Sequence, residues 1–101
     1  MHRFTVQYAV PADPAAFDRA YTDEHVPLVR ALPGLAGFSL CHPEPAGGDK
    51  TVYLVAQLDF ANAEALQEAL RSDAMAAAGR HAASLGVPMT MFSGEVVDVD
   101  L

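Results

Sequence analysis

The sequence has no tryptophan, one cysteine and only 6 lysine and arginine residues in a chain of 101 residues. The single cysteine, Cys41, cannot form an internal disulfide, which is typical of a reducing cytoplasm. The 13 acidic residues outnumber the basic ones and give a formal net charge of −7. Nucleic acids require patches of lysine and arginine that this chain lacks. We therefore expect a cytoplasmic protein that does not bind nucleic acid.

Long apolar runs are absent as well. No stretch approaches the ~20 apolar residues that a membrane-spanning helix needs, and the first residues lack the apolar segment of a signal peptide. Hydrophobic residues nevertheless make up 51% of the chain, against 19% charged, which indicates a folded core and excludes disorder. We expect one domain over residues 1–101, with no membrane partner.

Four stretches have the alternation of apolar and polar residues that predicts half-buried strands. They are residues 3–10, 36–42, 51–60 and 89–99. The apolar faces of the first three carry Phe4, Val6, Tyr8 and Val10, then Phe38, Leu40 and His42, then Val52, Leu54, Ala56, Leu58 and Phe60. The opposite faces carry few charges, and Tyr53 and Cys41 are placed there.

Two segments have helical spacing. Asp13 and Pro14 begin the first helix as cap and first residue, and Pro33-Gly34 ends it. Its apolar residues recur at steps of three and four: Phe17, Tyr21, His25, Leu28 and Leu32. Pro27 lies inside this pattern, so we expect a kink there. The second helix is predicted as continuous from Ala63 to about Ser84, capped by Asn62.

The resulting order, β-α-β-β-α-β, predicts a ferredoxin-like α+β fold. Its four-stranded antiparallel sheet has two helices on one face. The other face is semi-polar and uncovered, and a sheet face of this kind usually packs against a further layer. The simplest layer is the same face of a second copy, which predicts a homodimer.

The segment from Phe17 to Leu35 resembles the signature of the EthD family, within the dimeric α+β barrel superfamily. The residues that carry the resemblance are Phe17, Tyr21, His25, Pro27, Leu28 and the run Leu32-Pro33-Gly34-Leu35. Phe60 leading into an Asn-capped helix is compatible with it, as is the pair Ser72-Asp73, expected in mid-helix.

The resemblance implies two ferredoxin-like monomers that pair through their sheet faces into a barrel. Relatives include a muconolactone methylisomerase and fungal domains that dehydrate or decarboxylate polyketide intermediates. Neighbouring branches of the superfamily include cofactor-independent monooxygenases and polyketide cyclases. Their common chemistry is acid–base handling of small carbonyl-bearing, often aromatic, ligands without a bound cofactor.

His25 is the candidate catalytic residue. On the inward face of its helix it could be a packed histidine bonded to a backbone carbonyl. Two features favour a functional role: Pro27 interrupts the backbone ladder nearby, and Tyr21 offers a hydroxyl one turn earlier. An ordinary imidazole, with a pKa near ~6.5, suits proton transfer at neutral pH.

Tyr21, Tyr8 and His42 are the candidate substrate-binding residues, each with packing as the alternative. Cys41 and His42 are adjacent in a strand and point to opposite faces, so they do not form a nucleophile and base. The histidines have no metal-ligand spacing, and we predict no metal and no cofactor. Met75, Met89 and Met91 suit either a core or an apolar ligand cavity.

Three functions fit these residues. The first is a small cofactor-independent isomerase, lyase or cyclase in which His25 transfers a proton on a hydrophobic carbonyl-bearing or aromatic molecule and Tyr21 orients a carbonyl. The second is a non-catalytic protein that binds a metabolite or an enzyme of a degradation or polyketide pathway. The third is a cofactor-free monooxygenase acting on an activated phenol, for which the missing tryptophan counts slightly against.

Overall fold

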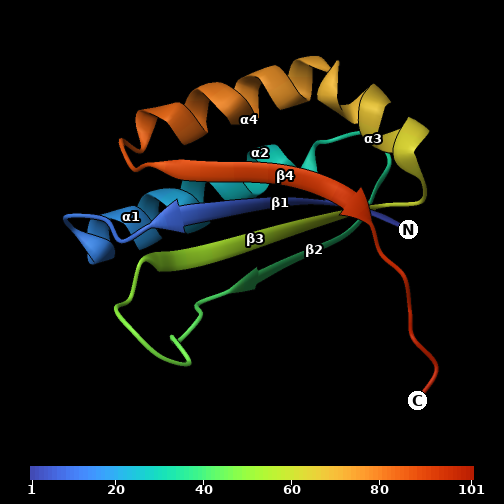
Figure 1. The fold of residues 1–101 in the computed structure, drawn as a ribbon. Coiled ribbons are helices and arrows are strands. Elements are labelled where there is room, and N and C mark those ends of the chain that lie inside the picture. Colours follow the sequence, from blue (N-terminus) through green and yellow to red (C-terminus); the bar gives the residue numbers. More distant parts are fainter.

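The computed structural model describes residues 1–101 and has the predicted order of strands and helical segments (Figure 1). The strands are β1 (His2–Ala9), β2 (Leu35–Cys41), β3 (Val52–Phe60) and β4 (Met89–Glu95). The helices are α1 (Pro14–Ala20), α2 (Val26–Arg30), α3 (Ala63–Leu70) and α4 (Asp73–Ser84), with a π-helical turn at Tyr21–His25 between α1 and α2. The fold is ferredoxin-like.

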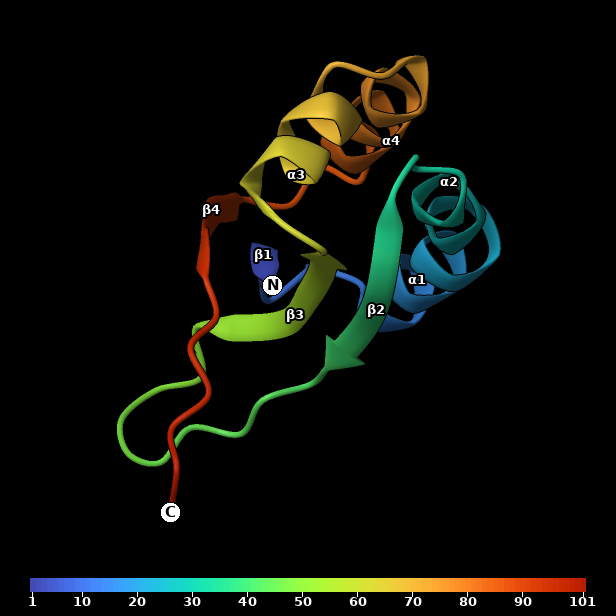
Figure 2. The ribbon, with the colours of Figure 1, turned by 90° about the vertical axis from the view of Figure 1, so that its right-hand side faces the viewer.

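The four strands form one antiparallel sheet in the order β2-β3-β1-β4, and the helices cover one of its faces (Figure 2). In the central pair, Phe4 lies opposite Leu58, Val6 opposite Ala56 and Tyr8 opposite Leu54. Because alternate residues of a strand point to one face, this register brings the apolar faces of β1 and β3 together beneath the helices.

The core lies between this sheet face and the helices. Its buried residues are Val6, Tyr8, Phe17, Tyr21, Val29, Leu32, Leu54, Ala56, Leu58, Phe60, Leu66 and Ala69. The predicted apolar faces of the two central strands are therefore confirmed except at Val10, which lies beyond the end of β1 and is 46% exposed. Each fully buried side chain of valine, leucine or phenylalanine contributes about 1.5–3 kcal/mol by leaving water, so the core holds the helices on the sheet.

The first helical segment differs from the prediction at its centre. The backbone widens into the π turn before Pro27, where the N–H of Val26 donates to the carbonyl of Tyr21, five residues back. Pro27 itself lies in the first turn of α2, where a missing N–H is tolerated. The predicted kink at Pro27 is thus a π turn one step earlier, a feature often found at functional sites.

The π turn also changes which residues point inward. In an α-helix, a step of four residues drifts by about 40° around the axis, and the wider π turn absorbs that drift. His25 and Val29 are therefore buried in line with Tyr21, whereas Leu28 is only partly buried. The prediction that Leu28 belongs to the inward stripe was wrong by one residue.

The second helical segment is two helices, not the continuous helix that was predicted. Arg71 ends α3, and Ser72 takes an extended conformation at the start of α4. The Ser72 hydroxyl accepts a hydrogen bond from the Met75 amide at 3.1 Å, which caps α4. The pair Ser72-Asp73 therefore begins a helix and does not lie in the middle of one.

Two strand predictions also need correction. β4 ends at Glu95, not at residue 99, and Val97 and Val99 are exposed. Tyr53 was assigned to the uncovered sheet face, but the register shift between Tyr8 and Ala9 turns its ring towards α1. Its hydroxyl donates to the carboxylate of Asp18 at 2.9 Å.

The helices of this fold are all too short or too polar to cross a membrane.

Candidate active site

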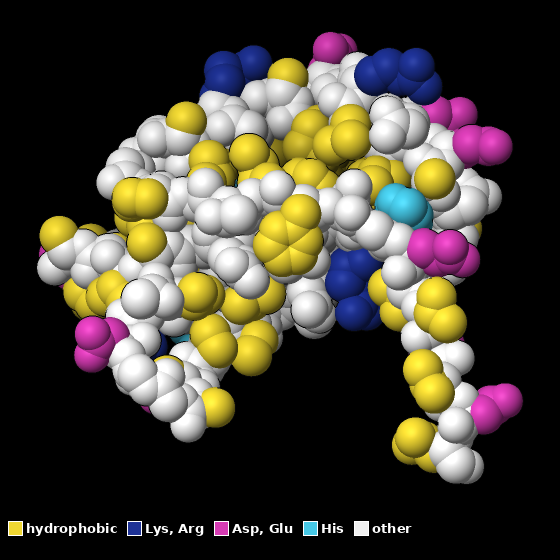
Figure 3. All heavy atoms as spheres, viewed as in Figure 1, with side chains coloured by type: hydrophobic (Ala, Val, Ile, Leu, Met, Phe, Trp, Pro, Cys, Tyr) yellow, Lys and Arg dark blue, Asp and Glu magenta, His cyan; other side chains and the backbone are white.

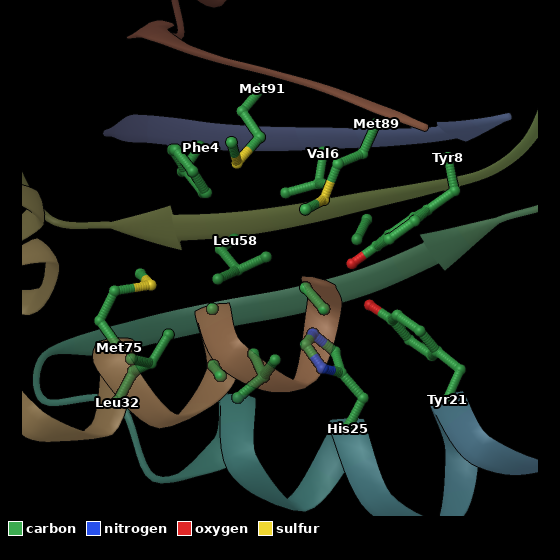
Figure 4. Close-up of a pocket in the computed structure, with 15 residues that line it drawn as sticks. Phe4, Val6, Tyr8, Tyr21, His25, Leu32, Leu58, Met75, Met89 and Met91 are labelled. Carbon is green, nitrogen blue, oxygen red and sulfur yellow. The ribbon is translucent and has the colours of Figure 1, made fainter. Parts of the chain in front are cut away.

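An apolar cavity lies between the sheet and the helices, at the level of the π turn (Figure 4). It has a volume of about 70 Å³, and 13 of its 15 lining residues are hydrophobic. The sheet contributes Phe4, Val6, Tyr8, Ala56, Leu58, Met89 and Met91, and the helical segments contribute Tyr21, His25, Val29, Leu32, Met75, Ala78, Gly79 and Ala82. Proteins commonly hold small ligands in apolar cavities of this kind, oriented by a few polar groups.

Three of the lining side chains carry polar atoms: Tyr8, Tyr21 and His25. Figure 4 shows the two hydroxyl groups close to the imidazole at one end of the cavity. Neither hydroxyl has a hydrogen-bond partner in the protein, and yet no side-chain nitrogen or oxygen is both fully enclosed and unpartnered. The hydroxyls of these two buried residues therefore keep accessible surface, which leaves them free to bond a ligand.

Aromatic packing fixes these three side chains. The rings of Tyr8 and Tyr21 meet edge to face, with centroids 5.6 Å apart, and Phe17 packs against both at 5.4 and 5.8 Å. The imidazole of His25 lies 4.8 Å from the ring of Tyr21. Pairs at these distances stabilise one another beyond simple burial, so the polar atoms are held in place before a ligand enters.

Burial sets the protonation of the site. It lowers the pKa of His25 to about 4, with a smaller effect from the charge of His81, and raises the pKa of Tyr8 to about 12. Burial and the neighbouring Tyr8 raise the pKa of Tyr21 as well. At neutral pH the site therefore offers a neutral imidazole and two protonated hydroxyl donors.

His25 has a hydrogen-bonding partner that sequence analysis missed. Its Nδ1 lies 3.0 Å from Nδ1 of His81, on α4, and Nε2 of His81 lies 3.3 Å from a carboxylate oxygen of Glu24. The two residues are 56 positions apart in the chain. The sequence predicted that this helical segment ends near Ser84, which places His81 in a helix. Only the packing of α4 against the π turn brings His81 to His25.

His42, in contrast, does not join the other candidates. It is exposed just beyond the end of β2, with its ring 5.1 Å from that of Tyr53 and Nδ1 3.1 Å from the Tyr53 carbonyl. It does not line the cavity. The structure brings together Tyr8, Tyr21 and His25 but not His42. No three histidine, cysteine or acidic side chains lie close enough to hold a metal ion.

The cavity opens between α4 and β4. Met91, on β4, lines the cavity and is 56% exposed, and Figure 3 shows hydrophobic side chains gathered in the recess between this strand and the helix above it. Because three of the lining residues are methionines, which fill irregular space flexibly, the opening can adapt to the shape of a ligand.

The fold and the cavity define a ferredoxin-like α+β protein with a buried histidine and two tyrosine hydroxyls facing an apolar pocket. The EthD domain model matches residues 10–85. The chain is 40% identical over 101 residues to an uncharacterized 11.0 kDa protein in the thcB-thcC intergenic region of Rhodococcus erythropolis, covering 96% of this chain and 98% of the relative. The chain belongs to the EthD family.

Solved structures agree with this assignment. An ethyl tert-butyl ether D (EthD) family protein from Bacillus halodurans superposes with a TM-score of 0.85 at 32% identity, over 96% of this chain and 99% of that one. SnoaB from Streptomyces nogalater, a cofactor-independent oxygenase crystallised as the mutant N63A, has a TM-score of 0.69 at 16% identity, over 97% and 94%. The second likeness shows the fold alone.

Proposed function

We propose that this protein is a cofactor-independent enzyme that moves a proton on a small hydrophobic carbonyl compound, as an isomerase, lyase or cyclase does. One observation carries the proposal: Tyr8, Tyr21 and His25 present polar atoms to a cavity that is otherwise apolar. Polar groups without partners are costly inside a protein unless a ligand uses them.

The elementary step is removal of a proton from the carbon next to the carbonyl group. The carbonyl oxygen accepts hydrogen bonds from the hydroxyls of Tyr8 and Tyr21, and a lone pair of His25 takes the proton. The electron pair of the broken C–H bond moves onto the oxygen, which becomes an enolate. Return of a proton to another atom gives isomerisation, and loss of a neighbouring leaving group gives elimination.

The protonation of the site supports this division of roles. Because the pKa of His25 is about 4, its imidazole is neutral at pH 7 and can accept a proton. It is a weaker base than a free imidazole, so the step depends on stabilising the enolate. The tyrosine hydroxyls keep their protons and supply that stabilisation as donors in a water-poor cavity.

The size of the cavity restricts the substrate. Its volume of about 70 Å³ is smaller than the ~150 Å³ of an engineered cavity that binds benzene. A ring compound therefore requires Met75, Met89 or Met91 to move aside, or extends through the opening beside β4. We infer a small apolar molecule, with one ring and one carbonyl group, as the substrate class.

Oxygen-dependent chemistry is the second candidate. The fold is shared with SnoaB, which is described as a cofactor-independent oxygenase. A base beside two hydroxyl donors could equally deprotonate an activated phenol before it reacts with oxygen. Consumption of dissolved oxygen during turnover distinguishes this function from proton transfer alone, and binding without turnover identifies a non-catalytic binding protein.

Deuterium exchange tests the main proposal. A panel of small ring ketones, including acetophenone, 4-hydroxyacetophenone and cyclohexanone, is incubated with the protein in D₂O, and loss of the α-proton signal is followed by NMR. We expect faster exchange than in buffer for at least one ketone, and we expect Ala78→Leu, which fills the cavity, to remove the acceleration. The proposal fails if no ketone is accelerated or if the folded Ala78→Leu variant keeps the full rate.

We also propose that the protein is a homodimer that works in the cytoplasm. The sheet face away from the helices carries Phe92, which is 49% exposed, beside a buried Thr5 in the neighbouring strand. Covering this face with a second copy would remove apolar surface from water. Light scattering at micromolar concentration should give twice the chain mass, and a monomer would contradict the proposal. The unpaired Cys41 suits a reducing compartment.

A further inference from the structure

Glu24, His81 and His25 form a chain of polar contacts from the surface to the cavity. The side chain of Glu24 is 65% exposed, that of His81 is 17% exposed, and His25 is buried at 5%. The links are 3.3 Å, from Glu24 Oε2 to His81 Nε2, and 3.0 Å, between the two Nδ1 atoms. The π turn supplies the first and last residues of this series of contacts, because Glu24 and His25 are adjacent in the sequence. α4 supplies His81 between them.

Hydrogen-bond chemistry decides where the protons lie. An ionised carboxylate only accepts, so Nε2 of His81 is the donor to Glu24. With His81 neutral, its single N–H is the one on Nε2, and its Nδ1 is therefore an acceptor. The facing Nδ1 of His25 must then be the donor. Since His25 is also neutral, its Nε2 carries a free lone pair.

The geometry points to Glu24 and His81 as positioning residues that hold His25 in the tautomer whose Nε2 lone pair faces the ligand. No hydrogen bond within the protein uses this Nε2, and the atom is not fully enclosed. This inference rests on the proposed function, because it explains how His25 is prepared to act as the base in the cavity. A carboxylate that fixes the tautomer of a catalytic imidazole is a general device.

The same chain gives the proton a route to solvent. When Nε2 of His25 takes a proton from the ligand, the ring carries two N–H groups and a positive charge. Its Nδ1 proton passes to Nδ1 of His81, and the Nε2 proton of His81 passes to the Glu24 carboxylate, which releases it to water. One proton enters at His25 and one leaves at Glu24, so the relay stays balanced.

Nitrogen NMR of the unliganded protein tests the tautomers directly. With ¹⁵N-labelled histidine at neutral pH, we expect the hydrogen of His25 on Nδ1 in the wild type. In His81→Phe the Nδ1 hydrogen loses its acceptor, and we expect it to move to Nε2. Glu24→Ala should shift the population in the same direction, whereas the matched control Asp23→Ala, which removes the neighbouring carboxylate, should leave the wild-type tautomer.

Two results would overturn the inference: a hydrogen on Nε2 of His25 in the wild type, or the same tautomer in the wild type and in the Glu24→Ala variant. Glu24 is exposed, so this variant keeps the test valid even if His81→Phe fails to fold. The measurement needs no ligand, and it therefore separates failure of the relay from failure of the proposed function. With a ketone whose α-proton exchanges, Glu24→Ala should lower kcat about tenfold with little change in KM. This loss is smaller than the ~10²–10⁴-fold rate acceleration of a general base, because Glu24 acts only through His25.

Discussion

The Nδ1 atoms of His25 and His81 lie 3.0 Å apart, although the residues belong to different helical segments. Two Nδ1 atoms at this distance share one hydrogen, so one ring donates and the other accepts. The pair therefore links the protonation of a buried imidazole to that of a partly exposed one. Several measurable consequences depend on this pair.

The stability of the protein should depend on pH through His25. Its pKa is lowered from 6.5 to about 4 in the folded protein, mainly by burial and then by the charge of His81. The unfolded chain therefore binds the proton first, so stability is complete above about pH 6.5, falls between 6.5 and 4, and levels off below 4. The loss is on the order of 3 kcal/mol at most, because each unit of pKa shift corresponds to ~1.36 kcal/mol.

Urea unfolding at several pH values, compared with His25→Gln, measures this contribution. The difference between the two curves therefore reports His25 together with its contact to His81. If the difference in unfolding free energy between the wild type and His25→Gln is the same at pH 7 and at pH 4, His25 has an ordinary pKa in the folded protein.

Removing the Tyr21 hydroxyl should affect ligand binding more than folding. The hydroxyl has no partner in the protein, so Tyr21→Phe should change the unfolding free energy by less than ~0.5 kcal/mol. A lost ligand hydrogen bond costs ~0.5–1.5 kcal/mol, which weakens the affinity for 4-hydroxyacetophenone about two- to thirteenfold. Tyr53→Phe, which removes a hydroxyl outside the cavity, is the matched control and should leave the affinity unchanged. Equal affinities for the wild type and Tyr21→Phe would argue against the placement of the carbonyl.

Gly79 offers a way to stabilise the protein at the edge of the cavity. It lies inside α4 and lines the cavity, and a Cβ atom added there would meet nothing within 4 Å. Gly79→Ala should therefore raise the unfolding free energy by roughly 0.5–1 kcal/mol, because alanine loses less backbone entropy in a helix. Thermal unfolding measures the effect, with Gly47→Ala in the loop after β2 as the control. A lower melting temperature for Gly79→Ala would mean that the site does not have this space.

The break between α3 and α4 should depend on Ser72. Its hydroxyl caps α4 by accepting from the Met75 amide, so Ser72→Ala should cost about 1 kcal/mol. Ser93→Ala on exposed β4 is a control without a capping role. Chemical denaturation of both variants measures the difference, and equal midpoints would show that the break is held by other contacts.

The sequence predicted the fold well because the strands of this protein follow strict alternation. Phe4, Val6 and Tyr8 pair across the sheet with an equally regular strand, so their burial was readable without any tertiary information. The resemblance over residues 17–35 also identified the family correctly. Alternation and local signatures lie within a single segment of the sequence, so they can be read without knowing which segments contact one another.

The features that were missed depend on contacts between segments or on small backbone changes. The π turn shifts the inward face from Leu28 to Val29, and no composition rule separates it from a continued α-helix. Ser72 was readable as a cap, but the alanine-rich pattern around it favoured a continuous helix. His81 has no local signal at all, because only the packing of α4 on the π turn places it 3.0 Å from His25.

In the proposed function, His25 is the base in an apolar cavity. The most direct test is the rate of α-proton exchange for the fastest ketone of the panel at pH 7, measured for the wild type and for His25→Gln under saturating conditions. We expect the variant to remain folded and to lose at least about a hundredfold in rate, which is the lower end of what a general base contributes. A folded His25→Gln variant that exchanges the proton as fast as the wild type would contradict it.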